Sequence, residues 1–256
     1  VWIPDLHFRW KMRGVFVEGE VYHIAGETDA IAPDFDKRTT ASITGLVARA
    51  GYENPSFRGL FEIGHASGDD VLLDEAFTGR PLHQDFNVGL ILYEQLLAQR
   101  TVEKFVGEPD LQGLWSNGGV YNSTYINPRV TLSPGDIFEF RLGFLMAFAD
   151  EIDGAIMPLL KDADGVQELN NDAITESRLL GTEVDLGIHM KWLEDHILVG
   201  VEAGYMHAGD RLGRTTQYTD PRTSAAPQPY NAAQYDQIVQ RLNNVWTLQG
   251  RFAFVF

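Results

Sequence analysis

Apolar and polar residues alternate along many segments of this chain. In the last eleven residues, every second position from Trp246 to Phe256 is apolar or aromatic except Gly250, and the positions between them are mixed and include Arg251. A period of two over this length predicts a β-strand with one strongly apolar face. The same alternation recurs, clearly or in weaker form, at 6–13, 15–25, 42–52, 57–66, 119–132, 136–149, 181–193 and 197–206. The pattern therefore predicts nine antiparallel strands.

Strand length and turn spacing distinguish two all-β architectures. In a soluble sandwich the apolar strand faces pack into a core, whereas in a transmembrane barrel they face lipid. The predicted strands exceed the usual ~5–6 residues, which suits a tilted crossing of the hydrocarbon layer. Short turns alternate with long connections at about 26–40, 67–116, 150–177 and 208–243. Aromatic residues gather near strand ends, as interfacial girdles require: Trp10, Tyr22, Tyr52, Trp192, Tyr205, Trp246 and Phe256.

These features favour an all-β, antiparallel transmembrane up-and-down β-barrel with short periplasmic turns and long extracellular loops. We expect a single domain over residues 1–256, with a soluble sandwich as the alternative. Nine strands would give the first and last strands the same direction, whereas single-chain bacterial barrels have an even number. We therefore expect at least one further strand before this sequence, which would make it the C-terminal part of a larger barrel.

The segment Phe86–Leu97 is apolar and lies within the longest connection. We expect it to form an amphipathic helix or a constriction element inside that loop. A tenth strand is the alternative, although it would break the up-and-down alternation at the turn Ser133-Pro134-Gly135.

Charged residues occupy strand positions opposite the apolar face, where a barrel would have its lumen. The basic residues are Arg9, Lys11, Arg13, Arg49, Arg58, Arg129, Arg141, Lys191 and Arg251. The acidic residues are Glu18, Glu20, Glu62, Glu139, Glu183, Asp185 and Glu202. Two interpretations remain open and can coexist. The charges form a cross-strand ion-pair network that stabilises the wall, or they form a selectivity surface for charged or sugar-like solutes.

The remaining composition excludes several classes of protein. The net charge is −16, whereas a nucleic-acid-binding protein needs a basic footprint. The chain has no cysteine, which removes disulfides and thiolate sites. It also lacks the ~18 consecutive apolar residues of a membrane helix. The acid-rich loops form a solvated surface or bind divalent ions. Asp162, Asp164 and Glu168 are weak calcium candidates without a complete calcium-binding loop, and we expect no resident cofactor.

Three motifs carry a resemblance to known outer-membrane proteins. The strand end at 61–70, which contains Ala66-Ser67-Gly68-Asp69, resembles alginate-export-type porins. The segment 199–210 is similar to a late strand-to-loop step of such barrels, including large myxobacterial ones. The terminal pattern looks like the signal read by the barrel-assembly machinery, carried by Trp246, Leu248, Gly250, Phe252, Phe254 and Phe256. The resemblance implies passive export or diffusion of a polysaccharide or small solute.

We therefore expect a non-enzymatic porin or channel in the outer membrane of a Gram-negative bacterium. Its expected partners are membrane lipid, lipopolysaccharide and the barrel-assembly machinery, with a homo-oligomer or a surface complex as further alternatives. A plugged structural barrel that anchors a surface assembly, or binds divalent ions and lipopolysaccharide, is the second hypothesis. A hydrolase at the barrel rim is a remote one, based on Asp69-Asp70 and on His207 with Asp210. The sequence has no Gly-x-Ser-x-Gly or His-Glu-x-x-His motif.

Overall fold

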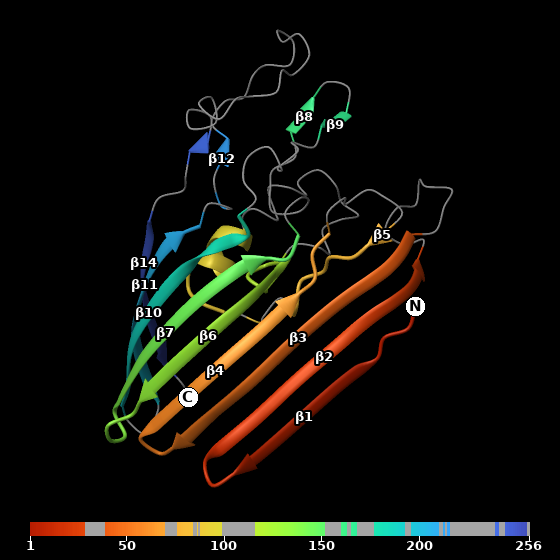
Figure 1. Ribbon diagram of the computed structural model, residues 1–256. Coiled ribbons are helices and arrows are strands. Elements are labelled where there is room, and N and C mark those ends of the chain that lie inside the picture. Colours follow the sequence, from red (N-terminus) through yellow and green to blue (C-terminus); the bar gives the residue numbers. More distant parts are fainter. Residues whose placement is uncertain are drawn as a thin grey trace.

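Nine long strands form one antiparallel sheet in this computed structural model (Figure 1). The structure describes residues 1–28, 39–69, 76–83, 86, 88–98, 116–151, 160–162, 165–167, 177–192, 196–209, 212, 214–215, 239–240 and 244–254. Along the sheet the strands are β1 (Asp5–Met12), β2 (Val15–Thr28), β3 (Thr39–Asn54), β4 (Phe57–Ala66), β6 (Ser123–Leu132), β7 (Phe138–Ala149), β10 (Leu179–Trp192), β11 (Ile197–Ala208) and β14 (Val245–Phe254). The prediction of a many-stranded antiparallel β protein is confirmed.

Short elements lie in the long connections. Strand β5 (Ala76–Phe77) pairs in parallel with β3 and completes the ten-stranded sheet. Two separate two-stranded antiparallel sheets pair β8 (Leu160–Asp162) with β9 (Gly165–Gln167) and β12 (Arg214–Thr215) with β13 (Val239–Gln240). One π-helical turn, η1, spans Leu92–Leu97. No helix in the described ranges has the length and apolar character needed to cross a membrane.

Turn geometry corrects one assignment made from the sequence. Arg13 does not lie on a strand, because β1 ends at Met12 and Arg13-Gly14 form a two-residue hairpin turn with φ of 49° and 85°. Left-handed φ values at both central residues are characteristic of this tight turn. Glu53 lies on β3, directly before the next turn. There, the Asn54 side-chain oxygen accepts hydrogen bonds from the backbone N–H groups of Ser56 (3.0 Å) and Phe57 (2.9 Å).

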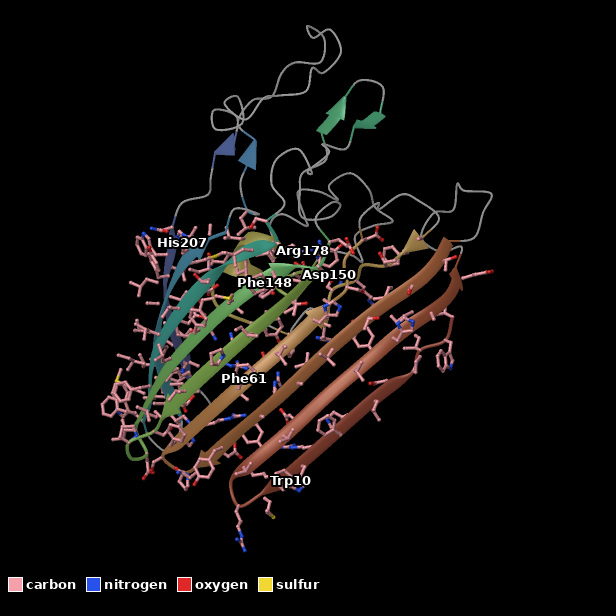
Figure 2. All side chains as sticks on the ribbon, viewed as in Figure 1. Trp10, Phe61, Phe148, Asp150, Arg178 and His207 are labelled. Carbon is pink, nitrogen blue, oxygen red and sulfur yellow. The ribbon has the colours of Figure 1, made fainter. Side chains whose placement is uncertain are left out.

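The two faces of the sheet have opposite character, as the alternation predicts. The sheet curls, and η1 lies inside the curve (Figure 1). On β7, Phe140 and Leu142 are exposed on the convex face, whereas Leu145 and Ala147 are buried on the concave face. Figure 2 shows the side chains along the strands. The large apolar residues exposed on the convex face include Phe8, Trp10, Phe61, Phe148, Leu186, Trp246 and Phe252.

One hydrophobic core fills the upper part of the concave side in the orientation of Figure 1. The chain between Leu82 and Ala98, here called the inward segment, supplies six of its sixteen residues. From the inward segment come Leu82, Val88, Ile91, Leu92, Tyr93 and Leu97, and from the sheet Tyr125, Leu145, Ala147, Leu180 and Met206. The Phe86–Leu97 stretch is thus helical over Leu92–Leu97, and the sheet has no strand there.

The sheet has two edges, β1 and β14. Because nine strands alternate in direction, these two edges run the same way. Within the described ranges neither edge pairs with a strand on its outer side. Closure into a barrel therefore stays a prediction.

Glycines on the concave face make room for aromatic rings of the neighbouring strand. Gly64 on β4 lies opposite Tyr125 on β6, and Gly45 on β3 lies opposite Tyr22 on β2. A Cβ atom at Gly64 would lie 2.4 Å from the Tyr125 ring, and one at Gly45 would lie 2.3 Å from the Tyr22 ring. Covering a strand glycine with a cross-strand aromatic ring protects its backbone and pins the strand register.

We predict that Gly64→Ala destabilises the sheet and that Gly250→Ala does not. Tyr125 is fully buried, so its ring has no space into which to retreat, and overpacking of this kind costs about 1–3 kcal/mol. Gly250 is also a strand glycine, but an added Cβ would meet nothing within 4 Å. The measurement is a urea titration of the full-length protein followed by tryptophan fluorescence. Equal midpoints for the two variants would contradict this packing.

Candidate functional site

A row of alternating charges crosses four strands on the concave face. Arg9, Glu18, Arg49 and Glu62 are direct register partners from β1 to β4. Side chains of direct partners lie ~4.5–5.5 Å apart at Cβ, so alternating signs bring each charge beside its opposite. The Arg9–Glu18 pair is 3.6 Å apart and the Arg49–Glu18 pair 3.2 Å. Arg49 also donates from Nε to Glu62 at 2.5 Å.

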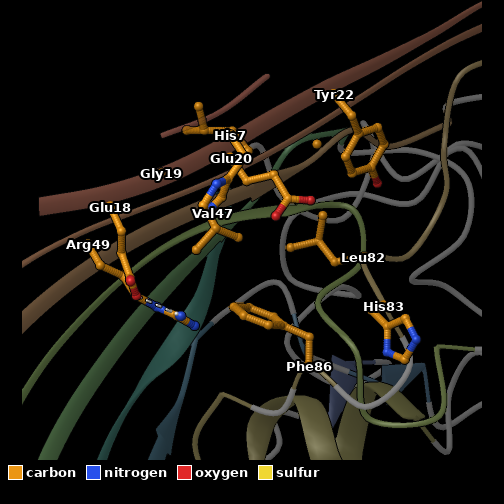
Figure 3. A pocket seen from close by; sticks show the side chains of 12 residues that line it. His7, Glu18, Gly19, Glu20, Tyr22, Val47, Arg49, Leu82, His83 and Phe86 are labelled. Atoms are coloured by element: carbon orange, nitrogen blue, oxygen red, sulfur yellow. Dashed lines mark hydrogen bonds and ion pairs between the residues drawn. The ribbon is translucent and has the colours of Figure 1, made fainter. Parts of the chain in front are cut away.

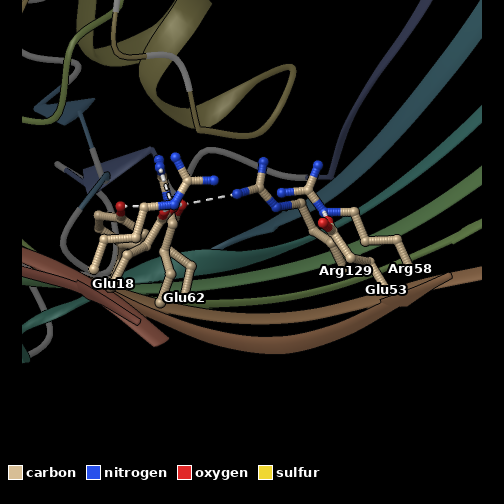
Figure 4. A network of polar contacts seen from close by, with 8 residues as sticks. Glu18, Glu53, Arg58, Glu62 and Arg129 are labelled. Atoms are coloured by element: carbon tan, nitrogen blue, oxygen red, sulfur yellow. Dashed lines mark hydrogen bonds and ion pairs between the residues drawn. The ribbon is translucent and has the colours of Figure 1, made fainter. Parts of the chain in front are cut away.

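Glu62 is the most deeply buried carboxylate of this row, with its side chain 1% exposed. It accepts hydrogen bonds from three residues on two neighbouring strands. Besides Arg49, these are Arg129 Nη2 at 2.8 Å and Tyr125 Oη at 2.9 Å. Figure 4 shows Glu62 within the charged network, together with Glu18 and Arg129. A buried carboxylate is tolerated only when such donors replace its lost hydration.

A second cluster of charges lies on the last strands. Glu202 on β11 contacts Arg251 at 3.3 Å, His189 at 3.1 Å and Arg141 at 3.9 Å. Arg141 also donates to Glu139 at 2.5 Å. The two clusters therefore link neighbouring strands across most of the concave face. These contacts are cross-strand ion pairs of the kind that the first interpretation of the sequence expects.

Between the two clusters lies a hollow of about 700 Å³ below η1. Its arginines come from five strands: Arg49, Arg58, Arg129, Arg141 and Arg251. Its carboxylates are Glu94 on η1 and, on the sheet, Glu139, Asp185 and Glu202. Cations and anions are thus nearly balanced around the hollow, and its walls are strongly polar.

Glu183 on β10 holds the inward segment. Its side chain, on a residue 1% exposed, accepts three backbone hydrogen bonds. The donors are the N–H groups of Leu90 (2.6 Å), Ile91 (2.8 Å) and Leu92 (2.9 Å), at the start of η1. Backbone amides at a helix start lack partners inside the helix, and a carboxylate aimed at them is strongly stabilising.

Tyr93 forms a second attachment of the inward segment. Its hydroxyl lies 2.9 Å from the Ser123 hydroxyl at the start of β6. Burial raises the pKa of the Tyr93 hydroxyl above its ordinary value, so this hydroxyl stays protonated. The inward segment is thereby fixed to β6 and β10.

The Ala66-Ser67-Gly68-Asp69 motif turns the chain at the end of β4. Ser67 Oγ accepts a hydrogen bond from Thr44 N at 2.9 Å and donates to the Thr78 carbonyl at 2.6 Å. Gly68 N donates to Asp150 at 2.9 Å, and Asp69 accepts from Thr78 N at 3.0 Å. These hydrogen bonds attach the beginning of the long connection to the end of the sheet. The motif therefore has a structural role.

The structure describes two of the residues of the rim-hydrolase hypothesis, Asp69 and His207. Asp69 is buried and bonded to Thr78 at the end of β4, whereas His207 on β11 bonds to Asn244 at 2.9 Å. Asp70 and Asp210 lie outside the described residues. So do Asp164 and Glu168, whereas Asp162 ends β8. Among the residues that are described, no group of three His, Asp or Glu could hold a metal.

Other predicted positions are found on the strands expected. Lys191 lies near the end of β10, and Glu20 lies two residues after Glu18 on β2. On β14, the residues of the terminal pattern from Trp246 to Phe254 are present, with the aromatic side chains exposed. Phe256 lies outside the described residues.

Sequence reasoning missed several partners in these clusters. Glu53 pairs with Lys11 and, at 3.5 Å, with Arg58, and it was not among the charged strand positions predicted from the sequence. Tyr125 and His189 lie on the concave face by strand alternation, which was the available signal. Tyr93 had no signal of its own, because its partner depends on where the inward segment folds.

Comparisons with known proteins add little to this geometry. No protein-family model matches the sequence, and no curated protein matches it. Among solved structures, the chain is similar to the outer-membrane expressed OmpT of Vibrio cholerae, with 11% sequence identity and a TM-score of 0.37. The match covers 99% of this chain and 56% of that protein, so the chain spans about half of its length. At this TM-score the function has to be argued from the chain's own residues.

We predict that Glu183→Gln loosens the inward segment. Replacing a charged acceptor of three N–H groups costs about 2 kcal/mol, which corresponds to roughly thirtyfold faster amide exchange in that segment. The measurement is hydrogen–deuterium exchange of peptides covering residues 88–98 in the full-length protein. Glu139→Gln is the matched control, because Glu139 bonds to Arg141 and not to the inward segment. Unchanged exchange in Glu183→Gln would show that the core alone holds the segment.

Proposed function

We propose that this chain forms the wall of an outer-membrane β-barrel channel, through which small polar solutes diffuse passively. The observation that carries the proposal is the reversed polarity of the sheet. Large apolar side chains are exposed on the convex face, while buried carboxylates and their arginine partners line the concave face. A water-soluble sheet has the opposite arrangement.

The convex face suits contact with lipid. Phe8 on β1, Phe61 on β4, Phe140 on β7 and Leu186 on β10 are all 40–56% exposed. Soluble proteins rarely expose contiguous apolar surface of this extent, whereas a transmembrane barrel requires an apolar band around its outside. This supports an outer-membrane location with membrane lipid and lipopolysaccharide as the surroundings. The exposed alternation of β14 supports recognition by the barrel-assembly machinery.

The concave face suits water and polar solutes. The hollow below η1 is walled by guanidinium and carboxylate groups held in place by ion pairs. Such fixed charges orient polar solutes without requiring a chemical step, and rings of charge set which ions pass. We therefore propose diffusion without catalysis and without a resident cofactor.

A plugged barrel that anchors a surface assembly is the second candidate. The observation in its favour is the inward segment, which packs tightly on β6, β7, β10 and β11 and is held by Glu183. A segment fixed in this way narrows the interior. The two candidates differ in one measurable property, the current through the inserted protein.

The experiment is single-channel recording of the full-length protein in a planar bilayer under a salt gradient. A channel gives stable ohmic steps, and Glu183→Gln is expected to raise the step size because the inward segment loosens. Heat-modifiable mobility on a gel checks that each protein is folded. A folded, inserted protein that passes no current, in the wild type and in Glu183→Gln, would overturn the channel proposal and favour the anchoring role.

A further inference from the structure

We propose that a cavity between the inward segment and strands β1–β3 binds a small organic cation, with its ammonium or guanidinium group at Glu20. The inference deepens the proposed function, since it assigns a solute class to one side of the channel interior. It rests on the shape of the cavity, on its charge and on its aromatic lining.

The cavity lies where the inward segment faces β2 and β3. The hydrogen bonds that the segment makes with Glu183 and Ser123 are on β10 and β6. On the opposite side a space of about 360 Å³ stays open beside β2 and β3, between Glu20, Tyr22 and Val47 on the sheet and Leu82 and Phe86 on the inward segment (Figure 3). This volume lies in the ~300–1,000 Å³ range of small-molecule sites.

The uncompensated charge of this cavity is negative. Arg49 and Glu18 both line it, but Arg49 is paired with Glu18 at 3.2 Å and with Glu62 at 2.5 Å. The remaining charged lining residue is Glu20, which forms no hydrogen bond or ion pair with any residue that the structure describes. Its register partners on β1 and β3 are His7 and Val47. Glu20 is exposed at the open side of the cavity, so its unpaired carboxylate is accessible to a cation that enters from solvent, and the opposite charges attract.

The rest of the lining suits the hydrocarbon part of such a cation. Leu82, Val47 and the Phe86 ring form an apolar surface beside Glu20 (Figure 3). The Phe86 ring forms a cation–π contact with Arg49, whose Cζ lies 5.4 Å from the ring centroid. Tyr22 adds a second aromatic ring near Glu20. Aromatic rings and a carboxylate together are the usual recognition elements for organic cations.

The test is calorimetric titration of the full-length protein in detergent micelles at pH 8. The probe is 2-phenylethylammonium, and 2-phenylethanol is its neutral counterpart of the same shape. We expect the cation to bind, the alcohol to bind at least tenfold more weakly, and Glu20→Gln to weaken cation binding about tenfold, because a charge-assisted hydrogen bond is lost. Asp136→Asn, an equal charge change at the exposed β6–β7 turn, is expected to leave binding unchanged.

A second variant, expected to bind the cation more tightly, keeps the test valid if Glu20→Gln fails to fold. Arg80 lies close enough to Tyr22 to interact with it electrostatically, so Arg80→Gln removes a competing positive charge. We expect it to tighten cation binding roughly two- to threefold.

Three results would overturn the inference: no binding of the cation, equal binding of the alcohol, or equal loss in Glu20→Gln and Asp136→Asn. Binding is measured without a bilayer. If the protein binds the cation but passes no current in the bilayer, only the channel proposal is overturned. If it passes current but does not bind the cation, only the proposed binding site is overturned.

Discussion

Two buried carboxylates impose the constraint on which the concave side of the sheet depends. Glu62 and Glu183 lie almost entirely out of water, and an ionised group in that position must be surrounded by donors. Glu62 obtains them from β3 and β6 and so ties neighbouring strands together. Glu183 obtains them from the backbone of the inward segment. The wall and the element that narrows its interior are thus held by the same kind of interaction.

This polar interior makes sense only together with the convex face. A sheet with its charges inside and its aromatic residues outside gains nothing from collapse in water, because the apolar band would remain exposed. In the proposed barrel the convex face would contact lipid and the concave face would contact water in the lumen, so each face would have suitable surroundings. The inward segment is the exception, since its core of leucines, tyrosines and isoleucine follows the rules of a soluble protein.

The sequence predicts the strands well because alternation depends on neighbours in the chain. The strand at Val245–Phe254 and the opposition of Phe140 to Arg141 on β7 could be read from period two alone. Turn residues were harder, since Arg13 and Glu53 take their places from φ angles and side-chain caps. The charged row needs the register of four strands. The partners of Glu183 could not be predicted, because they are backbone amides about ninety residues away.

That separation has a consequence for the order of assembly. The inward segment is made before β6, β7, β10 and β11, yet its hydrogen bonds and most of its core lie on those strands. Contacts between distant parts of a chain form late, after the loop between them has been closed. We therefore expect the concave side of the sheet to stay accessible to water until these strands have paired. The helical turn docks only when the C-terminal half of the wall is in place, as the last step of folding rather than its nucleus.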